Sequence, residues 1–413
     1  MKLNAFVAGV GMTRFGKHMD RGMKSLGGEA VLAALKDAGL EGADLQAAWM
    51  ANAAGGLITG QEMIGGQVIL RGVGIGRIPV INVENACASA SSAFHQAAAM
   101  VSAGLYDVAL AVGTEKLYHE NKAKTFAAYG AAVDVEAFQE IMANLKKNAE
   151  ASGAKSASSG AGKNRSMFMD IYASAARNHM KQFGTTAEQF AAVSAKNSFH
   201  GSLNDRAQFR EEMTVDEVLA APMIAEPLTR PMCSPIGDGA AAAILVSEKK
   251  ARELGLTKPV KVVSASLHSG WDQRPDDEVR NVSELCARNA YEEAGIGPAE
   301  LSLVELHDAS APAEVMAYEY LGLCSEGEGG PLVESGATRL GGRVPVNTSG
   351  GLLRKGHPVG ATGIAQVVEL TEQLQGRAGN RQVEGASIGL AHNGGGSIGT
   401  DAAAQCITIL RQA

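Results

Sequence analysis

Short apolar runs alternate with longer stretches of helical periodicity along most of this chain. The clearest runs are IPVINV (78–83), VALAVG (108–113), AAAAILVS (240–247) and GASIGLA (385–391). Runs of this length without polar alternation are typical of strands that are buried on both faces. Because helical segments separate them, the pattern predicts an α/β fold with largely parallel sheets.

The same pattern repeats within the chain. Residues 33–53 (AALKDAGLEGADLQAAWMANA) align without a gap to residues 289–309 (NAYEEAGIGPAELSLVELHDA), at an offset of 256 residues. Both segments predict a helix end, a glycine stop (Gly39 and Gly295), a short loop and a strand. The same offset places residues 4–13 over residues 260–269, two further strand-like runs. One offset that serves two separate segments indicates a duplicated α/β unit.

The repeat divides the chain into three parts. Residues 1–117 together with 225–255 form the first copy, and residues 256–413 form the second. Residues 118–224 are an insertion without a counterpart in the second copy. It contains the Ser/Gly/Ala stretch 152–162, which predicts a mobile loop. Basic residues flank this stretch, so the loop is either a solvated surface segment or a cap that meets an anionic, phosphate-bearing ligand.

Composition excludes several classes of protein. The net charge is −7, and a nucleic-acid surface needs a concentrated basic face. No apolar stretch reaches the roughly 18 residues of a membrane helix, and the N-terminus lacks the pattern of a signal peptide. Five widely spaced cysteines form no CxxC pair, which fits free thiols in a reducing compartment better than disulfides or a zinc site. We therefore expect a cytoplasmic enzyme with no metal in this chain.

Cys87 stands between a strand-like run and a small-residue helix that extends to about Ser102. A helix N-terminus favours an anion, so a thiol placed there is pushed towards thiolate. Small neighbours (Ala86, Ala88, Ser89) leave space for a substrate. A lone cysteine is nevertheless more often a buried packing residue than a nucleophile.

Three histidines change the interpretation of Cys87. His357 lies in a Gly/Pro-rich turn (350–363), His392 follows a strand and precedes three glycines, and His307 stands at the end of a strand. Imidazoles exchange protons near neutral pH, and the N–H groups of successive glycines form oxyanion-binding nests. Three histidines at strand ends of one half, facing a cysteine at the matching turn of the other, favour a nucleophile with acid/base partners.

At these residues the chain resembles the thiolase superfamily, and most closely its sterol-carrier-protein-type and lipid-transfer-protein-like branch. The resemblance extends over essentially the whole chain. It is carried by NACASASSAFHQA around Cys87, PMCSPIGDGAAAAILVSE (231–248), HDAS (307–310), GHPVGATG (356–363) and HNGGG (392–396). It implies two βαβαβαββ halves in a five-layered αβαβα arrangement with an inserted loop domain.

The resemblance also implies roles for individual residues. Cys87 would accept an acyl group from coenzyme A as a thioester, and His357 would activate it. The backbone N–H groups of Cys87 and of Gly394 and Gly395 would bind the thioester oxygen. Coenzyme A, as substrate and product, would contact Lys163, Arg165, Ser234 and Gly356.

The chain departs from the family at the second catalytic cysteine. Many thiolases carry it in a CxG motif, where this chain has His392-Asn393-Gly394, and the sterol-carrier branch carries it in HDCF, where this chain has HDAS. A carbon acid beside a thioester needs a base about 3 Å away. We expect His392 or His307 to replace the missing thiolate.

Three functions follow as alternatives. The first is an acyltransferase that cleaves or forms 3-oxoacyl-CoA through S-acyl-Cys87. The second is a lyase that cleaves 3-hydroxyacyl-CoA by retro-aldol chemistry, and the third is a non-catalytic carrier or assembly subunit. The intact Cys87 and its histidines favour the first. The resemblance further implies a homodimer or dimer of dimers that pairs edge strands of the N-terminal half, and it allows for a small zinc-ribbon/OB-fold partner protein.

Overall fold

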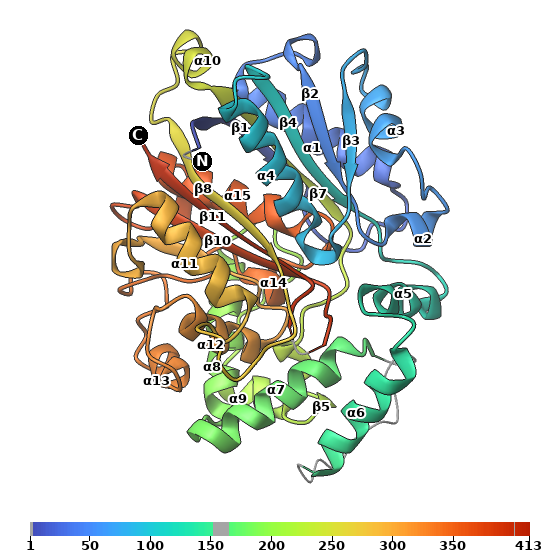
Figure 1. The fold of residues 1–413 in the computed structure, drawn as a ribbon, viewed down its shortest axis with the longest axis vertical. Helices are drawn as coiled ribbons and strands as arrows, with labels where there is room; N and C mark the ends of the chain where they lie inside the picture. The colour runs from blue at the N-terminus through green and yellow to red at the C-terminus, as the bar shows by residue number, and fades with distance from the viewer. Residues whose placement is uncertain (1–2, 152–164, 400) are drawn as a thin grey trace.

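The computed structural model describes residues 3–151, 165–399 and 401–413. In these residues nine strands join one sheet, in the order β3-β2-β4-β7-β1-β8-β11-β10-β9 (Figure 1). Their bounds are β1 Ala5–Met12, β2 Ala47–Ala51, β3 Val80–Val83, β4 Val108–Glu115, β7 Gly239–Ser247, β8 Val260–Ser269, β9 Leu303–Glu305, β10 Ile388–Gly395 and β11 Ala404–Gln412. A separate two-stranded ribbon pairs β5 (Met223–Ala225) with β6 (Leu228–Thr229).

The predicted duplication is confirmed in the order of the strands. The run β2-β4-β7-β1 of the first half is mirrored by β9-β10-β11-β8 of the second, and β1 meets β8 through three residue pairs. Helix α1 (Met23–Ala38) ends at Gly39 and helix α11 (Val282–Ala294) ends at Gly295, both glycines having φ of 65°. A 3₁₀ turn follows each glycine and leads to β2 or β9. Left-handed glycines therefore end equivalent helices, as the repeat predicts.

The expectation of largely parallel sheets is wrong. Only β2–β3, β2–β4 and β9–β10 are parallel, while the remaining pairings in the sheet are antiparallel. The strands are still uniformly apolar because helices cover both faces of the sheet. Continuous apolar runs report burial on two faces, and burial does not fix strand direction.

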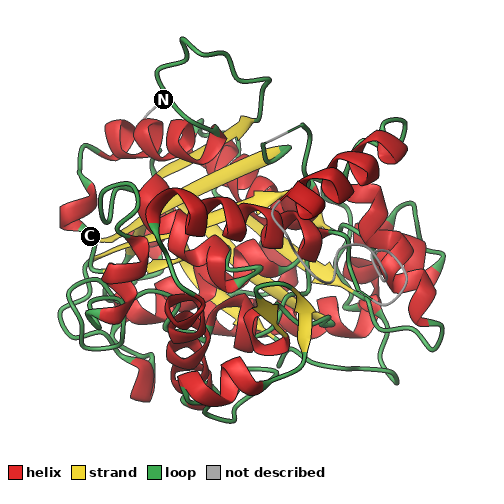
Figure 2. Cartoon of the chain, turned by 90° about the horizontal axis from the view of Figure 1, so that it is seen from below, coloured by secondary structure: helices red, strands yellow, loops and turns green. Residues whose placement is uncertain are grey.

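Helices form three layers around the two half-sheets (Figures 1 and 2). In the centre, α4 (Ser89–Ser102) and α15 (Thr362–Gln375) share one apolar cluster with strands of both halves. Helices α1 and α3 (Gly65–Gly72) cover the outer face of the first half. On the second half, α11 and α12 (Ala311–Tyr320) form the outer layer. The five-layered arrangement is thereby confirmed.

The segment 118–224 is mainly helical in its described residues. It contains α5 Lys122–Tyr129, α6 Phe138–Ala151, α7 Phe168–Phe183, α8 Ala187–Ser202 and α9 Val215–Ala220. Shorter helices elsewhere are α2 Gly55–Thr59, α10 Glu248–Glu253, α13 Gly329–Glu334 and α14 Gly351–Arg354. The Ser/Gly/Ala stretch 152–162 lies outside the described residues, and the three-part division of the chain stays a prediction.

Within the described ranges, none of the helices is both long enough and apolar enough to span a lipid bilayer.

Candidate active site

Cys87 lies in a strained turn at the N-terminus of α4. Residues Ala86–Ala88 form a 3₁₀ turn that leads into the helix, and Ala86 has a φ of 48°, in the left-handed region. Such a conformation is costly for a residue with a side chain and persists where surrounding contacts impose it. Gly395, at the end of β10, makes one of these contacts, because a Cβ there would lie 2.1 Å from the Asn85 carbonyl oxygen. The turn therefore needs a strand end without a side chain.

His357 presents one nitrogen without a hydrogen as a proton acceptor. Its Nδ1 lies 2.7 Å from the Thr362 hydroxyl, and that hydroxyl donates to the Pro358 carbonyl at 3.1 Å. Since the single hydroxyl proton is already committed, Nδ1 carries the hydrogen and donates to Thr362. The lone pair of the imidazole is then on Nε2, which leaves His357 able to act as a base.

His307 has the opposite arrangement. Its Nδ1 accepts hydrogen bonds from the Gly394 backbone N–H at 3.0 Å and from the Asn393 side-chain amide at 3.1 Å. The Asn393 amide is oriented by its oxygen, which accepts from the Ser91 hydroxyl at 2.8 Å. The hydrogen of His307 is therefore on Nε2, and this imidazole offers an N–H donor rather than a base.

The structure brings Cys87, His307 and His357 together. One side-chain atom from each lies within 4.8 Å of the others, and the two imidazole centroids are 5.1 Å apart at an interplanar angle of 66°. This grouping also resembles a metal site, but a metal would need a lone pair from each residue. The proton on His307 Nε2 removes one of the three ligands, so the set fits acid/base chemistry better than metal binding.

His392 lies beside this group on β10 and lines the same cavity. Its Nδ1 accepts the His307 backbone N–H at 3.4 Å, and its Nε2 faces the Ser283 hydroxyl at 3.4 Å. Ser283 donates its own proton to Gln405 Oε1 at 3.0 Å. Nε2 of His392 therefore carries the hydrogen, and His392 is a second N–H donor.

Burial keeps all four side chains neutral near pH 7. It raises the pKa of Cys87 to about 12, with a further increase from the nearby Glu115 carboxylate. Burial lowers the pKa of His307 to about 4 and that of His392 to about 3. Burial, helped by His307 and Lys355, also places the pKa of His357 well below its usual value. The expectation that the helix N-terminus shifts Cys87 towards thiolate is wrong, because desolvation outweighs the backbone dipoles.

The backbone N–H groups expected to bind the thioester oxygen, those of Cys87, Gly394 and Gly395, lie in different surroundings. The Gly394 N–H is bonded to His307, so it is not free for a substrate. The backbone N–H group of Cys87, together with that of Gly396, faces the thiol, where both lower its pKa in opposition to burial. Gly395 serves a steric purpose, since its missing side chain admits the Cys87 turn.

Glu115, which the sequence reasoning missed, connects the two halves behind the thiol. Its carboxylate accepts the Gly360 N–H at 2.9 Å and the Ala53 and Ala54 N–H groups at 3.2 Å each. Burial raises the pKa of Glu115 to about 7. A charged residue that ends a buried apolar strand was the available signal, because such a residue needs several donors.

The four side chains line a cavity of about 740 Å³. Arg165 and Ser234 also line it, as expected for contacts with coenzyme A, whereas Lys163 lies outside the described residues. Gly356 is not among the lining residues, and its backbone packs against Gln208 and Phe15. That these four residues contact coenzyme A stays a prediction.

The segment 118–224 supplies an aromatic wall that sequence reasoning missed. Phe126 and Tyr129 of α5 and Phe168 and Tyr172 of α7 line the cavity. The apolar residues of α7 recur at helical spacing, and this periodicity was the signal that could have indicated a cavity-facing helix. The lining is thus mainly apolar around a small group of polar catalytic candidates, as is common for small-molecule sites.

Comparison with known proteins agrees with this geometry. The family model described as "Thiolase, N-terminal domain" matches residues 5–249, and "Thiolase C-terminal domain-like" matches residues 264–411. An acetyl-CoA acetyltransferase of Methanothermobacter thermautotrophicus is 40% identical over 96% of this chain and 97% of its own length. The benzoylsuccinyl-CoA thiolase subunit BbsB of Thauera aromatica is 35% identical over 96% of both chains. Human sterol carrier protein 2 is 36% identical over 94% of this chain and 69% of its own length.

Solved structures show the same fold. The Ltp2-ChsH2(DUF35) aldolase superposes with a TM-score of 0.77 at 25% identity, covering 98% of this chain and 97% of that chain. Human mitochondrial 3-ketoacyl-CoA thiolase superposes with a TM-score of 0.69 at 16% identity, covering 100% and 99% of the two chains. The resemblance seen in the sequence is confirmed, and the chain belongs to the thiolase family.

Proposed function

We propose that this chain is an acyl-CoA C-acyltransferase that cleaves or forms 3-oxoacyl-CoA through an S-acyl-Cys87 intermediate. The observation that carries the proposal is the convergence of Cys87, His307 and His357 within 4.8 Å at the wall of a 740 Å³ cavity. The relatives named as acetyl-CoA acetyltransferase and benzoylsuccinyl-CoA thiolase support this class of reaction.

In the direction of cleavage, His357 Nε2 takes the proton of the Cys87 thiol as the sulfur attacks the 3-oxo carbon. The bond between the α and β carbons then breaks, leaving an acyl group on sulfur and an acetyl-CoA enolate. The imidazolium of His357 returns its proton to the enolate carbon. Coenzyme A next gives its thiol proton to His357 and attacks the acyl-Cys87 thioester, and the released Cys87 sulfur regains that proton. One base thus balances every proton transfer.

The hydrogen bonds give His307 and His392 a different role from the one expected. Each has its hydrogen on Nε2, and each has a pKa so low that the ring stays neutral. Neutral N–H donors stabilise charge that develops on a thioester or enolate oxygen. We therefore assign these two histidines to oxyanion stabilisation, and the proton work of the missing second cysteine to His357.

Binding of coenzyme A is proposed at the side of the cavity that carries Arg165 and Ser234. Arg165 is held by Asp170 through two hydrogen bonds of 2.6 and 3.1 Å, so its guanidinium is oriented beside the cavity. An oriented guanidinium is suited to a phosphate or a carbonyl of the ligand.

The test is to incubate the protein with acetyl-CoA or a 3-oxoacyl-CoA and to look for an acyl adduct by intact-mass spectrometry. We expect one adduct per chain, absent from Cys87→Ala and retained in Cys233→Ala, a control cysteine that lines the same cavity. Turnover of Cys87→Ala should fall by about 10³-fold or more. A wild-type protein without an adduct, together with undiminished turnover by Cys87→Ala, would sink the acyl-enzyme proposal.

A retro-aldol lyase is the second candidate. The Ltp2-ChsH2(DUF35) aldolase has the same fold and favours it, as does the absence of a second cysteine in the two motifs where the family carries one. Retro-aldol cleavage of a 3-hydroxyacyl-CoA needs a base and oxyanion donors but no nucleophile. Cleavage of such a substrate by Cys87→Ala, with or without a small zinc/OB-fold partner protein, would establish the lyase instead.

We also propose a homodimer, which itself could pair into a dimer of dimers. Strand β3 is an edge of the sheet with no neighbour on its outer side in the described residues, and Ile81 on it is 37% exposed. Met63 and Ile64 are exposed nearby at 77% and 60%. An open apolar edge invites pairing with a second copy. Sedimentation equilibrium tests this, with Ile81→Lys expected to yield monomers.

The cytoplasmic location stays a prediction.

A further inference from the structure

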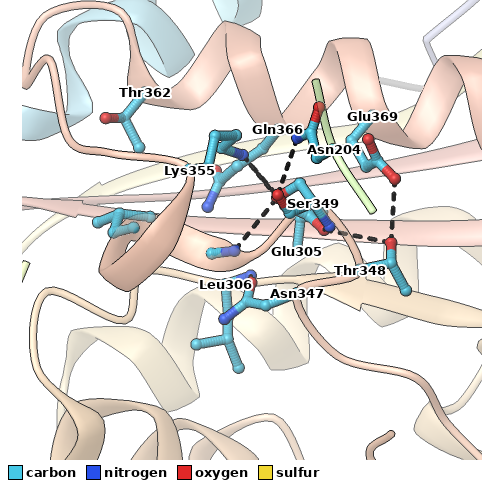
Figure 3. Close-up of polar contacts among 12 residues, drawn as sticks. Asn204, Glu305, Leu306, Asn347, Thr348, Ser349, Lys355, Thr362, Gln366 and Glu369 are labelled. Atoms are coloured by element: carbon cyan, nitrogen blue, oxygen red, sulfur yellow. Dashed lines mark hydrogen bonds and ion pairs between the residues drawn. The ribbon is translucent and has the colours of Figure 1, made fainter. Parts of the chain in front are cut away.

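A buried ion pair lies behind the two histidines that face Cys87. Lys355 Nζ is 3.2 Å from Glu305 Oε2, and each side chain is only 1% exposed (Figure 3). In sequence, Glu305 precedes His307 by two residues and Lys355 precedes His357 by two residues. The pair therefore joins the end of β9 to the turn before α15 at matching distances from both imidazoles.

Ser349 makes the connection rigid. Its hydroxyl donates to Glu305 Oε2 and accepts from Lys355 Nζ at 2.9 Å, and its backbone N–H donates to Glu305 Oε1 at 3.0 Å (Figure 3). The Ser349 carbonyl accepts from the Asn204 side chain at 2.8 Å. Asn347, two residues earlier, accepts the Leu306 N–H at 2.9 Å. Both backbone segments that carry the histidines are thus tied to one short stretch, residues 347–349.

Neighbouring charges are paired elsewhere. Glu369 bonds Arg381 at 3.0 Å, and Glu372 bonds Arg206. Glu305 is the one carboxylate that forms an ion pair with Lys355 among the described residues. Removing either member would therefore leave an uncompensated buried charge.

Stability alone does not account for this arrangement. Desolvation of two buried ions offsets most of their attraction, and neutral side chains of similar volume often replace such a pair without loss of stability. What neutral side chains do not reproduce is the directed set of hydrogen bonds between the two segments.

We infer that the Glu305–Lys355 pair is a positioning device that holds His307 and His357 in register with each other and with Cys87. The inference rests on the proposed function, since that function gives the two imidazoles their tasks. Glu305, Lys355 and Ser349 are positioning residues, because none of them lines the cavity.

The charge of Lys355 adds a measurable consequence. In the described part of the chain, the titratable groups that face His357 are Cys87, His307 and Lys355. Burial is the largest cause of the low pKa of His357, and His307 and the Lys355 ammonium lower it further. Without the ammonium, its contribution is lost and the pKa of His357 rises, while burial still holds it below its usual value. The acid limb of a base-dependent rate then moves to higher pH, since the base is lost by protonation at a higher pH.

The test compares wild type with Glu305→Gln/Lys355→Met, in which both charges are removed at nearly constant volume. We measure unfolding by urea, and the rate of Cys87 acylation by acetyl-CoA as a function of pH by intact mass. The expected result is a wild-type unfolding midpoint with an acylation rate at least about tenfold lower and an acid limb at higher pH. Ser349→Ala, which keeps both charges, should slow acylation without moving the acid limb.

Arg206→Met/Glu372→Gln is the matched control, because it removes another partly buried pair that hydrogen-bonds neither histidine in the described residues, while Arg381, which also contacts Glu372, keeps Glu369. It should acylate at the wild-type rate. Wild-type kinetics in Glu305→Gln/Lys355→Met at every pH would overturn the inference, and so would failure of that variant to fold, which would show that the pair serves stability. Absence of an adduct in wild type would instead refute the proposed function.

Discussion

The two halves of the molecule repeat the same elements and place different chemistry at the same turns. Helices α4 and α15 have 14 residues each, and strands β4 and β10 have eight each. Counted from the first residue of each helix, Cys87 in the first half corresponds to Gly360 in the second. The two strand ends correspond as well, with Glu115 opposite Gly395.

Each strand end contacts the turn of the other half. Glu115 of β4 accepts the N–H of Gly360, whereas Gly395 of β10 lies against the turn that carries Cys87. In the first contact, the Glu115 carboxylate bonds the turn of the second half. In the second contact, the missing side chain of Gly395 lets the strand end approach the Cys87 turn closely. The backbone is thus duplicated while the chemistry is divided, with the nucleophile in one half and the imidazoles in the other. The comparison teaches that a helix N-terminus alone does not make a reactive site, because burial raised the pKa of Cys87 to about 12 despite it.

The largest effect should come from removing the base that the second half contributes. His357→Gln deprives the neutral Cys87 thiol of its proton acceptor, so acylation of Cys87 should slow by about 10²- to 10⁴-fold. Time-resolved intact mass with acetyl-CoA measures this rate. His268→Gln is the control, because His268 belongs to the same half on β8 and is not among the residues that line the cavity. Unchanged acylation in His357→Gln would contradict the assignment of the nucleophile to the first half and of its base to the second.

Glu115→Gln tests the contact in which the carboxylate at the end of β4 bonds the Gly360 turn. Its folded pKa is about 7, above the usual 4.5, so folding binds a proton between these values. For wild type this contribution to the unfolding free energy is full below pH 4.5 and falls as pH rises to about 7. As pH rises from 4.5 to about 7, the unfolding free energy of wild type should therefore fall by about 3 kcal/mol relative to that of the variant. Urea unfolding at several pH values measures it, and a pH-independent difference would show that the carboxylate stays ionised.

Gly395→Ala tests the close contact between the end of β10 and the Cys87 turn, with the smallest expected effect. A Cβ placed 2.1 Å from the Asn85 oxygen and 2.6 Å from Ala88 N forces the Cys87 turn to move. We expect a loss of about 2 kcal/mol in unfolding free energy. Acylation of Cys87 should slow as well, because the turn shifts.

The control is Gly297→Ala, where a Cβ meets nothing within 4 Å and φ is −116°. Its unfolding free energy should change by no more than about 0.5 kcal/mol. If both variants behave alike, close approach at Gly395 is not what shapes the turn.

Local pattern was sufficient for the fold class. Apolar runs located the strands, and the shared offset of Gly39 and Gly295 located the duplication, because helix ends and buried strands are set by nearby residues. Strand direction was beyond the pattern, since a strand covered on both faces is apolar in either direction. The aromatic wall from α5 and α7 was missed because the internal repeat offers no segment to align with residues 118–224.

The sequence by itself determined that this is a duplicated α/β chain of the thiolase type, with Cys87 and three histidines as its candidate chemistry. Only the tertiary structure decided the state of those groups. The turn that carries His357 fixes its proton through Thr362, five residues further on, whereas that of His307 is fixed through Gly394, which lies far away in the chain. Contacts between residues far apart in the chain also set the neutral resting state of Cys87 and join Glu305 to Lys355. Protonation and position depend on burial and on partners, and a linear pattern contains neither.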